Sequence, residues 1–445
     1  MSETLLSVGI DLGTTTTQMI LSRLWVEHMA DPFAVPRMEI TRREIIYKSG
    51  IHFTPLLSQD VIDADGIRKI VDQEYEKAGV APAAIQTGAV IITGETARKE
   101  NAAEVLSALS GYAGEFVVAT AGPALESILA ARGAGADRLA KQKGRYVLHF
   151  DIGGGTSNLA LFDPDGQLED TGCLNVGGRL MKFREDGTVS YISPVLRDLH
   201  TDDPKRVAAF LVQVLEEAAG LRPETVLLHQ FITDKTVRLP GERPILSFSG
   251  GVADLIGNEE PNWLRYGDLG VLLGRAIRNS KLCAGDYHLG SETIRATVVG
   301  AGSYSTELSG STVYCVNLDP PLRDLPVIPV DGLDAGQIRE KIKLYGDQIS
   351  ALHLKGEQAP SFQKISELAD VITEAVRPLD RPLVILLEFD MAKVLGQALH
   401  LRLGRDVSLA CLDGIHVPVG SYLDLARPVA NGAAFPVVVK TLAFL

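Results

Sequence analysis

One motif occurs twice in this chain of 445 residues and limits the folds that the chain can adopt. An apolar run, Leu5–Ile10, leads into Asp11-Leu12-Gly13 and several threonines, and a second apolar run begins at Met19. The pattern returns 140 residues later, where Tyr146–Phe150 leads into Asp151–Thr156. Apolar runs on both sides of a glycine-rich turn are typical of β-hairpins. A repeat at this distance predicts two similar domains rather than a short-period solenoid.

The composition of the two turns predicts a site for a polyphosphate and a divalent cation. Glycines let successive backbone N–H groups point into one concavity, and threonine hydroxyls add donors without charge. Two carboxylates would repel a polyphosphate unless a cation lay between them, so Asp11 and Asp151 are the expected Mg²⁺ ligands and catalytic carboxylates. Two ordinary hairpins with solvated aspartates are the alternative. The expected phosphate-binding residues are Gly13, Thr14, Thr15, Thr16, Gly153, Gly154, Gly155 and Thr156.

A third segment has the form of a strand that runs into a Gly-Gly turn and then a helix. It covers Ile245–Ala253, and its turn consists of Ser249, Gly250 and Gly251. Paired glycines permit close approach of the backbone to a flat ring or a ribose. Alone this signal is weak, because such junctions occur in many α/β proteins.

Composition excludes several classes of function. The chain has 43 Lys and Arg against 56 Asp and Glu, a net charge of −13, which argues against nucleic acid or an anionic membrane as partner. No apolar run approaches the length of a membrane span, and no N-terminal stretch reads as a signal peptide. The four cysteines are scattered, so a reducing cytoplasm is the expected location. P-loop, G-x-S-x-G and H-E-x-x-H motifs are missing from the sequence.

Together these segments resemble the nucleotide-binding signature of the actin, sugar-kinase and heat-shock chaperone ATPase superfamily. The resemblance implies an α/β fold in which two duplicated ribonuclease H-like lobes surround a nucleotide cleft, with ATP and Mg²⁺ as cofactors. The matching segments are the phosphate loops Asp11–Thr17 and Asp151–Ser157, the adenosine loop Ser249–Ala253, the connecting helices Thr120–Gly133 and Ala296–Gly302, and the Gly177-Gly178 loop.

Within that superfamily, the whole chain is most similar to the ethanolamine ammonia-lyase reactivating factors. The supporting stretches are Leu6–Thr17, Ile91–Asn101, His149–Asn158, Thr171–Arg179, Ser247–Asp254 and Tyr266–Gly274. The resemblance implies a molecular chaperone and slow ATPase that makes ethanolamine ammonia-lyase release damaged cobalamin, so that intact adenosylcobalamin can enter. The sequence has no D-x-H-x-x-G cobalamin motif. The chain is therefore expected to act on the lyase without holding the cofactor itself.

One position departs from the chaperone ATPases. They carry a catalytic glutamate just before the proline of the first connecting helix, where this chain has Ala121-Gly122-Pro123. Glu126 and Glu95 are the candidates for the group that orients the attacking water, although either can equally be a surface carboxylate. A weak water-orienting group implies slow hydrolysis, which suits a switch better than a metabolic kinase.

The order of the segments predicts three parts. Residues 1–143 form the first lobe, residues 144–310 form the second lobe with the adenosine loop, and residues 311–445 form a C-terminal α/β region that packs on the core or contacts the client. Asn317–Pro329 has four prolines in thirteen residues and is expected to be a linker or an extended edge. The sequence leaves open both a homo-oligomer and association with a bacterial microcompartment.

Two alternatives belong to other classes of protein. An actin-like filament protein often has a basic amphipathic C-terminal helix, whereas Ala433–Leu445 is mostly apolar and is expected to be a strand. A small-molecule kinase of the same fold needs a further catalytic aspartate in the cleft, and none can be located from the sequence. Pelleting with ATP would identify the filament protein, and ADP release that depends on a small acceptor would identify the kinase.

Overall fold

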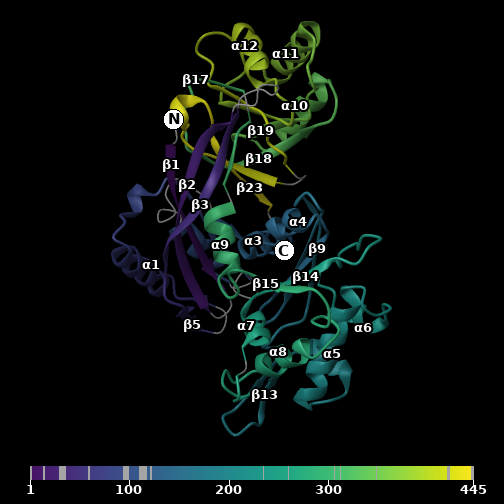
Figure 1. Ribbon diagram of the computed structural model, residues 1–445. Helices are drawn as coiled ribbons and strands as arrows, with labels where there is room; N and C mark the ends of the chain where they lie inside the picture. The colour runs from purple at the N-terminus through teal and green to yellow at the C-terminus, as the bar shows by residue number, and fades with distance from the viewer. Residues whose placement is uncertain are drawn as a thin grey trace.

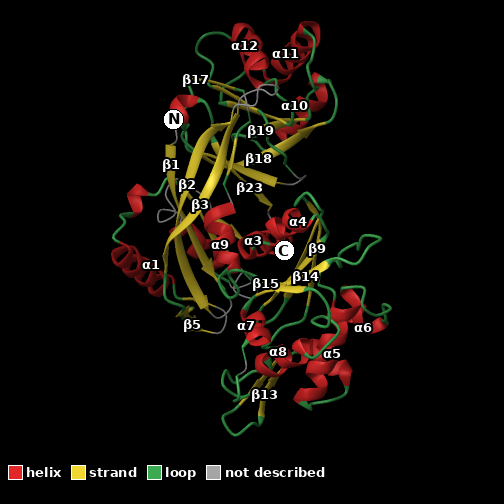
Figure 2. Ribbon diagram, viewed as in Figure 1, coloured by secondary structure: helices red, strands yellow, loops and turns green. Residues whose placement is uncertain are grey.

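The computed structural model describes residues 3–13, 16–29, 37–58, 61–93, 100–109, 118–120, 123–233, 235–258, 260–304, 306–310, 312–346, 348–417 and 421–441. Within these ranges the chain forms three large β-sheets with helices packed against them (Figures 1 and 2). The first two sheets lie in the lower and middle parts of Figure 1, and the C-terminal sheet lies at the top.

The first sheet has the strand order β3-β2-β1-β7-β8. Its first three strands are antiparallel, whereas β7 and β8 continue parallel to β1. A short strand, β4, pairs with the start of β2. The strands are β1 (Glu3–Leu12), β2 (Thr16–Met29), β3 (Arg37–Lys48), β4 (His52–Phe53), β7 (Thr87–Ile92) and β8 (Val118–Thr120).

The second sheet repeats this topology strand for strand. Its order is β11-β10-β9-β14-β15, with three antiparallel strands followed by two that run parallel to β9. The strands are β9 (Val147–Ile152), β10 (Ser157–Phe162), β11 (Leu168–Leu174), β14 (Ile245–Ser249) and β15 (Tyr287–Leu289). Because both sheets have the same order and directions, the expected α/β fold with two duplicated ribonuclease H-like lobes is confirmed.

Amphipathic helices cover the sheets. In α1, Asp63 caps the N-terminus and Gly79, in the left-handed conformation with φ 66°, ends the helix. Its buried residues pack on the first sheet, and α5, α7 and α8 pack on the second. The helices of the two lobes are α1 (Ala64–Ala78), α2 (Ala102–Leu109), α3 (Pro123–Ala134), α4 (Ala136–Lys143), α5 (Pro204–Ala218), α6 (Val226–Phe231), α7 (Gly251–Gly257), α8 (Gly270–Arg278) and α9 (Ala296–Tyr304).

Helices α3 and α9 cross at the centre of the molecule, between the first and second sheets (Figure 1). Glycines let their backbones touch: a Cβ on Gly133 would lie 1.9 Å from the carbonyl oxygen of Ala296, and one on Gly300 would lie 2.0 Å from that of Leu129. Helix α9 meets strand β1 in the same way at Gly9 and Gly302. The two expected connecting helices therefore form one closely packed pair.

The C-terminal region builds a sheet of eight strands, in the order β16-β23-β22-β18-β19-β20-β21-β17. Helices α11 and α12 pack together over its buried residues, beside α10. The elements are β16 (Glu307–Leu308), β17 (Val313–Val316), β18 (Leu322–Val330), α10 (Ala335–Lys343), β19 (Ala351–Leu354), α11 (Phe362–Val376), β20 (Leu383–Leu387), α12 (Ala392–Leu403), β21 (Leu409–Leu412), β22 (Ser421–Leu425) and β23 (Pro436–Thr441).

The expectation of a linker or edge at Asn317–Pro329 is wrong for most of that segment. Strand β18 lies inside the sheet, antiparallel to β22 and parallel to β19. Leu325, Val327 and Ile328 are buried, and a register shift between Leu322 and Leu325 interrupts the pairing near the start of the strand. Each proline removes a single N–H donor, and burial of the apolar side chains outweighs that loss.

The C-terminal region also contacts the first lobe. Ala426 and Val438 form one buried cluster with Ala89 and Ile91 of β7 and Ala301 of α9. The domain boundaries given above remain a prediction. The remaining short elements are β5 (Leu56–Ser58), β6 (Val61–Ile62), β12 (Met181–Phe183), β13 (Val189–Ile192) and the 3₁₀ helices Pro82–Ala84, Pro194–Leu199 and Ala430–Gly432.

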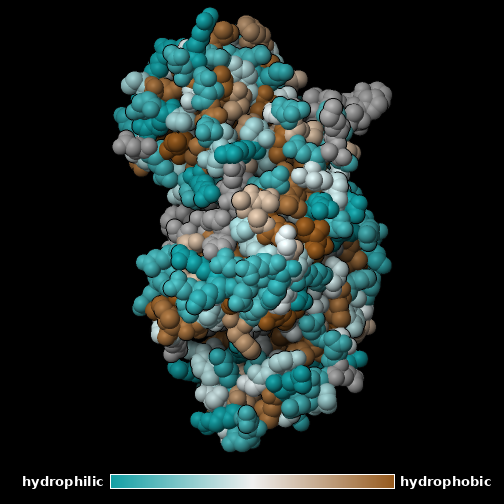
Figure 3. All heavy atoms as spheres, turned by 90° about the vertical axis from the view of Figure 1, so that its left-hand side faces the viewer, coloured by the Kyte–Doolittle hydropathy of each residue, from teal (hydrophilic) through white to brown (hydrophobic). Residues whose placement is uncertain are grey.

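Most of the apolar side chains lie inside the molecule, and the surface is mainly polar. Figure 3 shows a mainly hydrophilic face on which hydrophobic side chains form separate small groups. Among the residues that the structure describes, no helix combines the length and apolar character needed to cross a membrane.

Candidate functional site

The two glycine-rich turns share a backbone hydrogen bond at the same position. In the first, the N–H of Gly13 donates to the carbonyl of Thr16 over 2.9 Å, and in the second Gly153 donates to Thr156 over the same distance. Each turn joins two antiparallel strands, as the hairpin interpretation predicted. Thr14 and Thr15 lie outside the described residues.

Asp11 lies near the end of β1, beside Ile91 of β7. Its carboxylate accepts a hydrogen bond from the hydroxyl of Thr93 over 3.0 Å. Burial raises the pKa of Asp11 to about 7; the Thr93 hydrogen bond lowers it and the nearby Asp151 carboxylate raises it further. The structure therefore brings the Asp151 carboxylate close enough to Asp11 to disfavour its charged form.

Asp151 lies at the corresponding place on β9, opposite Ser249 of β14. Only 6% of the residue is exposed, and its carboxylate accepts a hydrogen bond from the Ser249 hydroxyl. Burial raises the pKa of Asp151 to about 6, while the Ser249 hydrogen bond opposes that rise. Ser249, expected as part of the adenosine loop, thus also contacts a proposed metal ligand.

A buried hydrogen-bond chain continues from Ser249. His149 Nε2 lies 2.8 Å from the Ser249 hydroxyl, and His149 Nδ1 lies 3.0 Å from the Ser247 hydroxyl. Burial lowers the pKa of His149 to about 3, so the ring is neutral at pH 7. Because the Ser249 hydroxyl donates its hydrogen bond to Asp151, it can only accept from His149. His149 therefore donates from Nε2, and its Nδ1 accepts from the Ser247 hydroxyl.

Sequence reasoning missed His149 and Ser247, although one signal was present. Each lies two positions before a residue that was identified, Asp151 or Ser249, and side chains two apart lie on the same face of a strand. The structure adds that β9 and β14 are neighbours, which places both pairs side by side.

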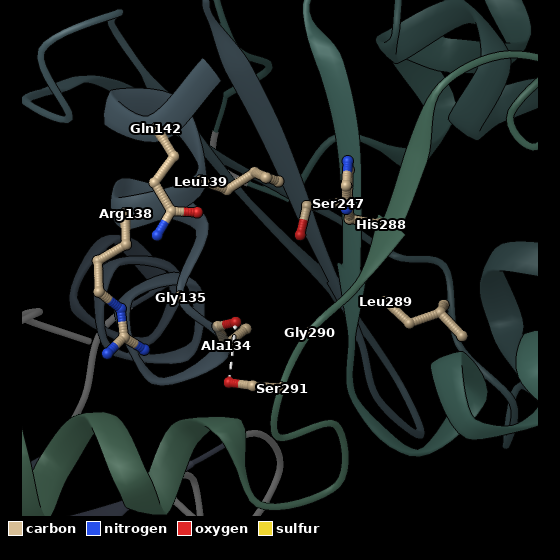
Figure 4. A pocket seen from close by; sticks show the side chains of 10 residues that line it. All are labelled: Ala134, Gly135, Arg138, Leu139, Gln142, Ser247, His288, Leu289, Gly290 and Ser291. Carbon is tan, nitrogen blue, oxygen red and sulfur yellow. Dashed lines mark hydrogen bonds between the residues drawn. The ribbon is translucent and has the colours of Figure 1, made fainter. Parts of the chain in front are cut away.

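Ser247 also lines a surface hollow of about 270 Å³ between α4 and β15 (Figure 4). Arg138 and Gln142 of α4 lie across this hollow from His288, and Ser291 donates to the carbonyl of Ala134 at its lower edge. The far end of the hydrogen-bond chain from Asp151 is therefore close to the surface of the second lobe.

The residues at the two turns fit a divalent cation. Burial disfavours the negative charges of both Asp11 and Asp151, and the nearby Asp151 carboxylate further disfavours that of Asp11. Within the described ranges, no group of three or more His, Cys, Asp and Glu side chains could hold a metal. A pair of carboxylates with waters and phosphate oxygens in the other positions is a donor set typical of Mg²⁺.

The Gly177-Gly178 loop packs directly on the second turn. Gly178 donates to the carbonyl of Gly153 over 3.0 Å, and Arg179 donates to that of Gly154 over 2.6 Å. A Cβ on Gly177 would lie 2.3 Å from the carbonyl oxygen of Gly154. A glycine is therefore needed at Gly177 for the two loops to touch.

The glycines of the adenosine loop have different reasons to be glycine. Gly250 has a φ of 88°, and a Cβ there would lie 2.3 Å from the carbonyl oxygen of Ile152. In contrast, a Cβ on Gly251 or on Gly155 would meet no described atom within 4 Å. Packing does not require these two glycines, which is the pattern expected where a ligand approaches the backbone.

The two glutamates expected to orient water have different outcomes. Glu126 is half-buried in the first turn of α3, and its proposed role remains a prediction. Glu95 lies outside the described residues, as do Ala121 and Gly122. Thr93, which contacts Asp11, was not identified from the sequence.

Comparison with known proteins gives two near-full-length relatives. The ethanolamine ammonia-lyase reactivase EutA of Salmonella typhimurium is 38% identical over 463 residues, covering 99% of this chain and 98% of the relative. The protein of the same name from Escherichia coli K12 is 37% identical, with the same coverage.

Solved structures with a similar arrangement are more distant. A Ppx/GppA family member of Aquifex aeolicus is 13% identical with a TM-score of 0.41, and it covers 67% of this chain and 97% of its own. The ethanolamine utilization protein EutJ of Carboxydothermus hydrogenoformans is 16% identical with a TM-score of 0.36, covering 67% and 89%.

The family comparison covers almost the whole chain. The model of the ethanolamine utilisation protein EutA family matches residues 3–445, which include both hairpins, the adenosine loop and the C-terminal sheet. With this match and the identity to the two curated relatives, the chain belongs to the EutA family of ethanolamine utilisation proteins.

Proposed function

We propose that this chain is an ATP-dependent chaperone that reactivates ethanolamine ammonia-lyase by driving release of damaged cobalamin, so that intact adenosylcobalamin can bind. The client is suggested by the printed names of the two relatives, both ethanolamine ammonia-lyase reactivases. The observation that carries the nucleotide part is the pair of matching hairpins, which bring the Asp151 carboxylate close enough to raise the pKa of Asp11.

The residues of the site divide the work of binding ATP. Asp11 and Asp151 would hold Mg²⁺, and the N–H groups of the two turns would bind the phosphates. Gly250 and Gly251 would let the nucleoside approach the start of α7. Bound Mg²⁺ neutralises phosphate charge and orients the terminal phosphate. Thr93 and Ser249 orient the two carboxylates through their hydrogen bonds, and Glu126 or Glu95 would orient the attacking water.

Nucleotide state would reach the client through the relative position of the lobes. The glycine contacts between α3 and α9 let these helices cross at backbone distance. A nucleotide that binds residues of both lobes favours the arrangement of the lobes in which both sets of residues reach it. Hydrolysis of the nucleotide removes that preference. The resulting rotation is the proposed means of loosening the contact between lyase and cobalamin.

The proposal includes a location and a division into parts. Cys173, Cys283, Cys315 and Cys411 are all free thiols, which suits action in the cytoplasm. Association with a microcompartment is left open. Residues 1–143 and 144–310 would form the ATPase lobes, and residues 311–445 would contact the client or support the first lobe.

The test is recovery of ethanolamine ammonia-lyase that has been blocked with cyanocobalamin. The full chain is added with adenosylcobalamin, Mg²⁺ and ATP, and lyase activity is followed. Recovery is expected with ATP and not without it, and Asp151→Asn should abolish it. Asp198→Asn, which changes an exposed carboxylate of the same lobe, is the matched control. Equal recovery with and without ATP, or no recovery at all, would contradict the proposal.

A further inference from the structure

Arg179 follows the Gly177-Gly178 loop and lies against the second phosphate loop. Its backbone N–H donates to Gly154, and its Cδ lies 3.2 Å from the position that a Cβ of Gly154 would take. The aliphatic part of the side chain therefore runs across the loop whose N–H groups are proposed to bind phosphate. The sequence alone had assigned no role to Arg179.

The guanidinium group of Arg179 is held only weakly. Its Nε lies 3.4 Å from a carboxylate oxygen of Asp268, and 35% of the side chain is exposed. Asp268 is itself nearly buried, at 8% exposure, and its other oxygen accepts a hydrogen bond from Gly270 over 2.9 Å. Because Gly270 is the first residue of α8, Arg179 connects the phosphate loop to that helix.

Asp268 does not depend on Arg179 alone. Burial raises the pKa of Asp268, and the Gly270 hydrogen bond and the charges of Arg179 and Lys182 oppose that rise. If Arg179 turned away, the Asp268 carboxylate would keep the Gly270 hydrogen bond and the Lys182 charge. The loss of one partner is therefore tolerable, and a phosphate with more than one negative charge is a stronger competitor for the guanidinium.

We propose that Arg179 binds the terminal phosphate of a nucleoside triphosphate and returns to Asp268 when that phosphate is lost. This inference rests on the proposed function, since it assumes that a nucleotide occupies the cleft. Arginine suits the role because its planar group can contact two phosphate oxygens at once. Helix α8 packs on α7, which starts at the adenosine loop, so the exchange links phosphate to the nucleoside side of the cleft.

The experiment measures affinity for ATP, for its non-hydrolysable imido analogue and for ADP, each with Mg²⁺, by calorimetry on the full chain. In Arg179→Ala, affinity for the two triphosphates is expected to fall about tenfold or more, the scale of a charged hydrogen bond, with a much smaller change for ADP. The affinity of Arg179→Lys for the triphosphates should lie between that of the unaltered chain and that of Arg179→Ala. Asp268→Asn keeps the acceptor for Gly270 and removes the competing charge, so it should bind triphosphates more tightly.

Arg184→Ala is the matched control, because Arg184 is an exposed arginine of the same lobe that contacts Thr188 in the turn of the β12–β13 hairpin. Equal losses for ATP and ADP in Arg179→Ala, or values like those of Arg184→Ala, would overturn the inference. If Arg179→Ala shows no cooperative thermal transition, the ATP-to-ADP ratio of Asp268→Asn decides, and an unchanged ratio overturns it. If the unaltered chain binds neither nucleotide, the proposed function fails as well, which separates the two failures.

Discussion

The hydroxyl of Ser249 donates a hydrogen bond to the carboxylate of Asp151, although 98 residues of chain separate them. Ser249 belongs to the adenosine loop and Asp151 to the second phosphate loop. The nucleoside and phosphate parts of the candidate site are therefore joined by a direct contact, and His149 supports that contact from behind.

Replacing Ser249 tests this contact. A hydrogen bond to a carboxylate favours its charged form, so Ser249→Ala should raise the pKa of Asp151 above its value of about 6. At pH 7 a larger fraction of Asp151 would then be protonated. We expect affinity for Mg-ATP to fall about tenfold at pH 7 and to recover toward pH 8.5. Ser247→Ala should have a smaller effect, because Ser247 acts on Ser249 only through His149. A loss that does not depend on pH would contradict this explanation.

Replacing the Asp11 carboxylate should raise the stability of the chain at high pH while weakening nucleotide binding. The pKa of Asp11 is about 7 in the folded protein and 3.8 when exposed, so the folded state keeps a proton that the unfolded state loses between these values. The free energy of unfolding therefore falls, through Asp11, as pH rises across this window. Asp11→Asn should melt at a higher temperature than the unaltered chain at pH 8, with the difference vanishing below about pH 4, and it should bind Mg-ATP far more weakly.

Asp198→Asn is the control for Asp11→Asn, because it removes one exposed negative charge without touching the site. The melting temperature of each protein is measured without nucleotide across pH 4 to 8. If Asp11→Asn were instead less stable at pH 8, the folded chain would favour the charged carboxylate, and the raised pKa of Asp11 would be contradicted.

His149 predicts the opposite dependence on pH. Its pKa is about 3 in the folded protein and 6.5 when exposed, so the unfolded state takes up a proton that the folded state excludes. The contribution of His149 is fully present above pH 6.5 and is lost as pH falls toward 3. His149→Gln lacks this titration. Its melting temperature relative to the unaltered chain should therefore rise as pH falls below 6.5, as scanning calorimetry would measure, and a constant difference would refute the assignment.

The close crossing of α3 and α9 predicts that a single added methyl group at Gly300 lowers the stability of the chain. In Gly300→Ala the added Cβ would lie 2.0 Å from the Leu129 carbonyl oxygen, so the helices must separate. We expect a loss of about 1–3 kcal/mol in the free energy of unfolding by urea denaturation, despite the better helix propensity of alanine. Gly241→Ala, whose Cβ would meet no described atom within 4 Å, should be near neutral. Equal stability of the two variants would contradict the crossing geometry.

The parts of the fold that follow local patterns could be predicted from the sequence. The two hairpins agree with the structure, and so does the strand that leads into the Gly250-Gly251 turn and a helix. Each depends on hydrophobic period or on turn glycines, which neighbouring residues determine. Strand β18 could not be predicted in this way, because its prolines suggest an edge while its central place in the sheet depends on β19 and β22.

The sequence by itself determined that two aspartates stand at the ends of two similar hairpins, because strand period and turn glycines are local properties of the chain. The tertiary structure alone decided what surrounds them. Parallel pairing of β14 with β9 placed Ser249 and His149 beside Asp151, and parallel pairing of β7 with β1 brought Thr93, which follows β7, to Asp11. Burial then raised the pKa of both carboxylates, since solvent exclusion depends on everything packed around a group and no single segment encodes it.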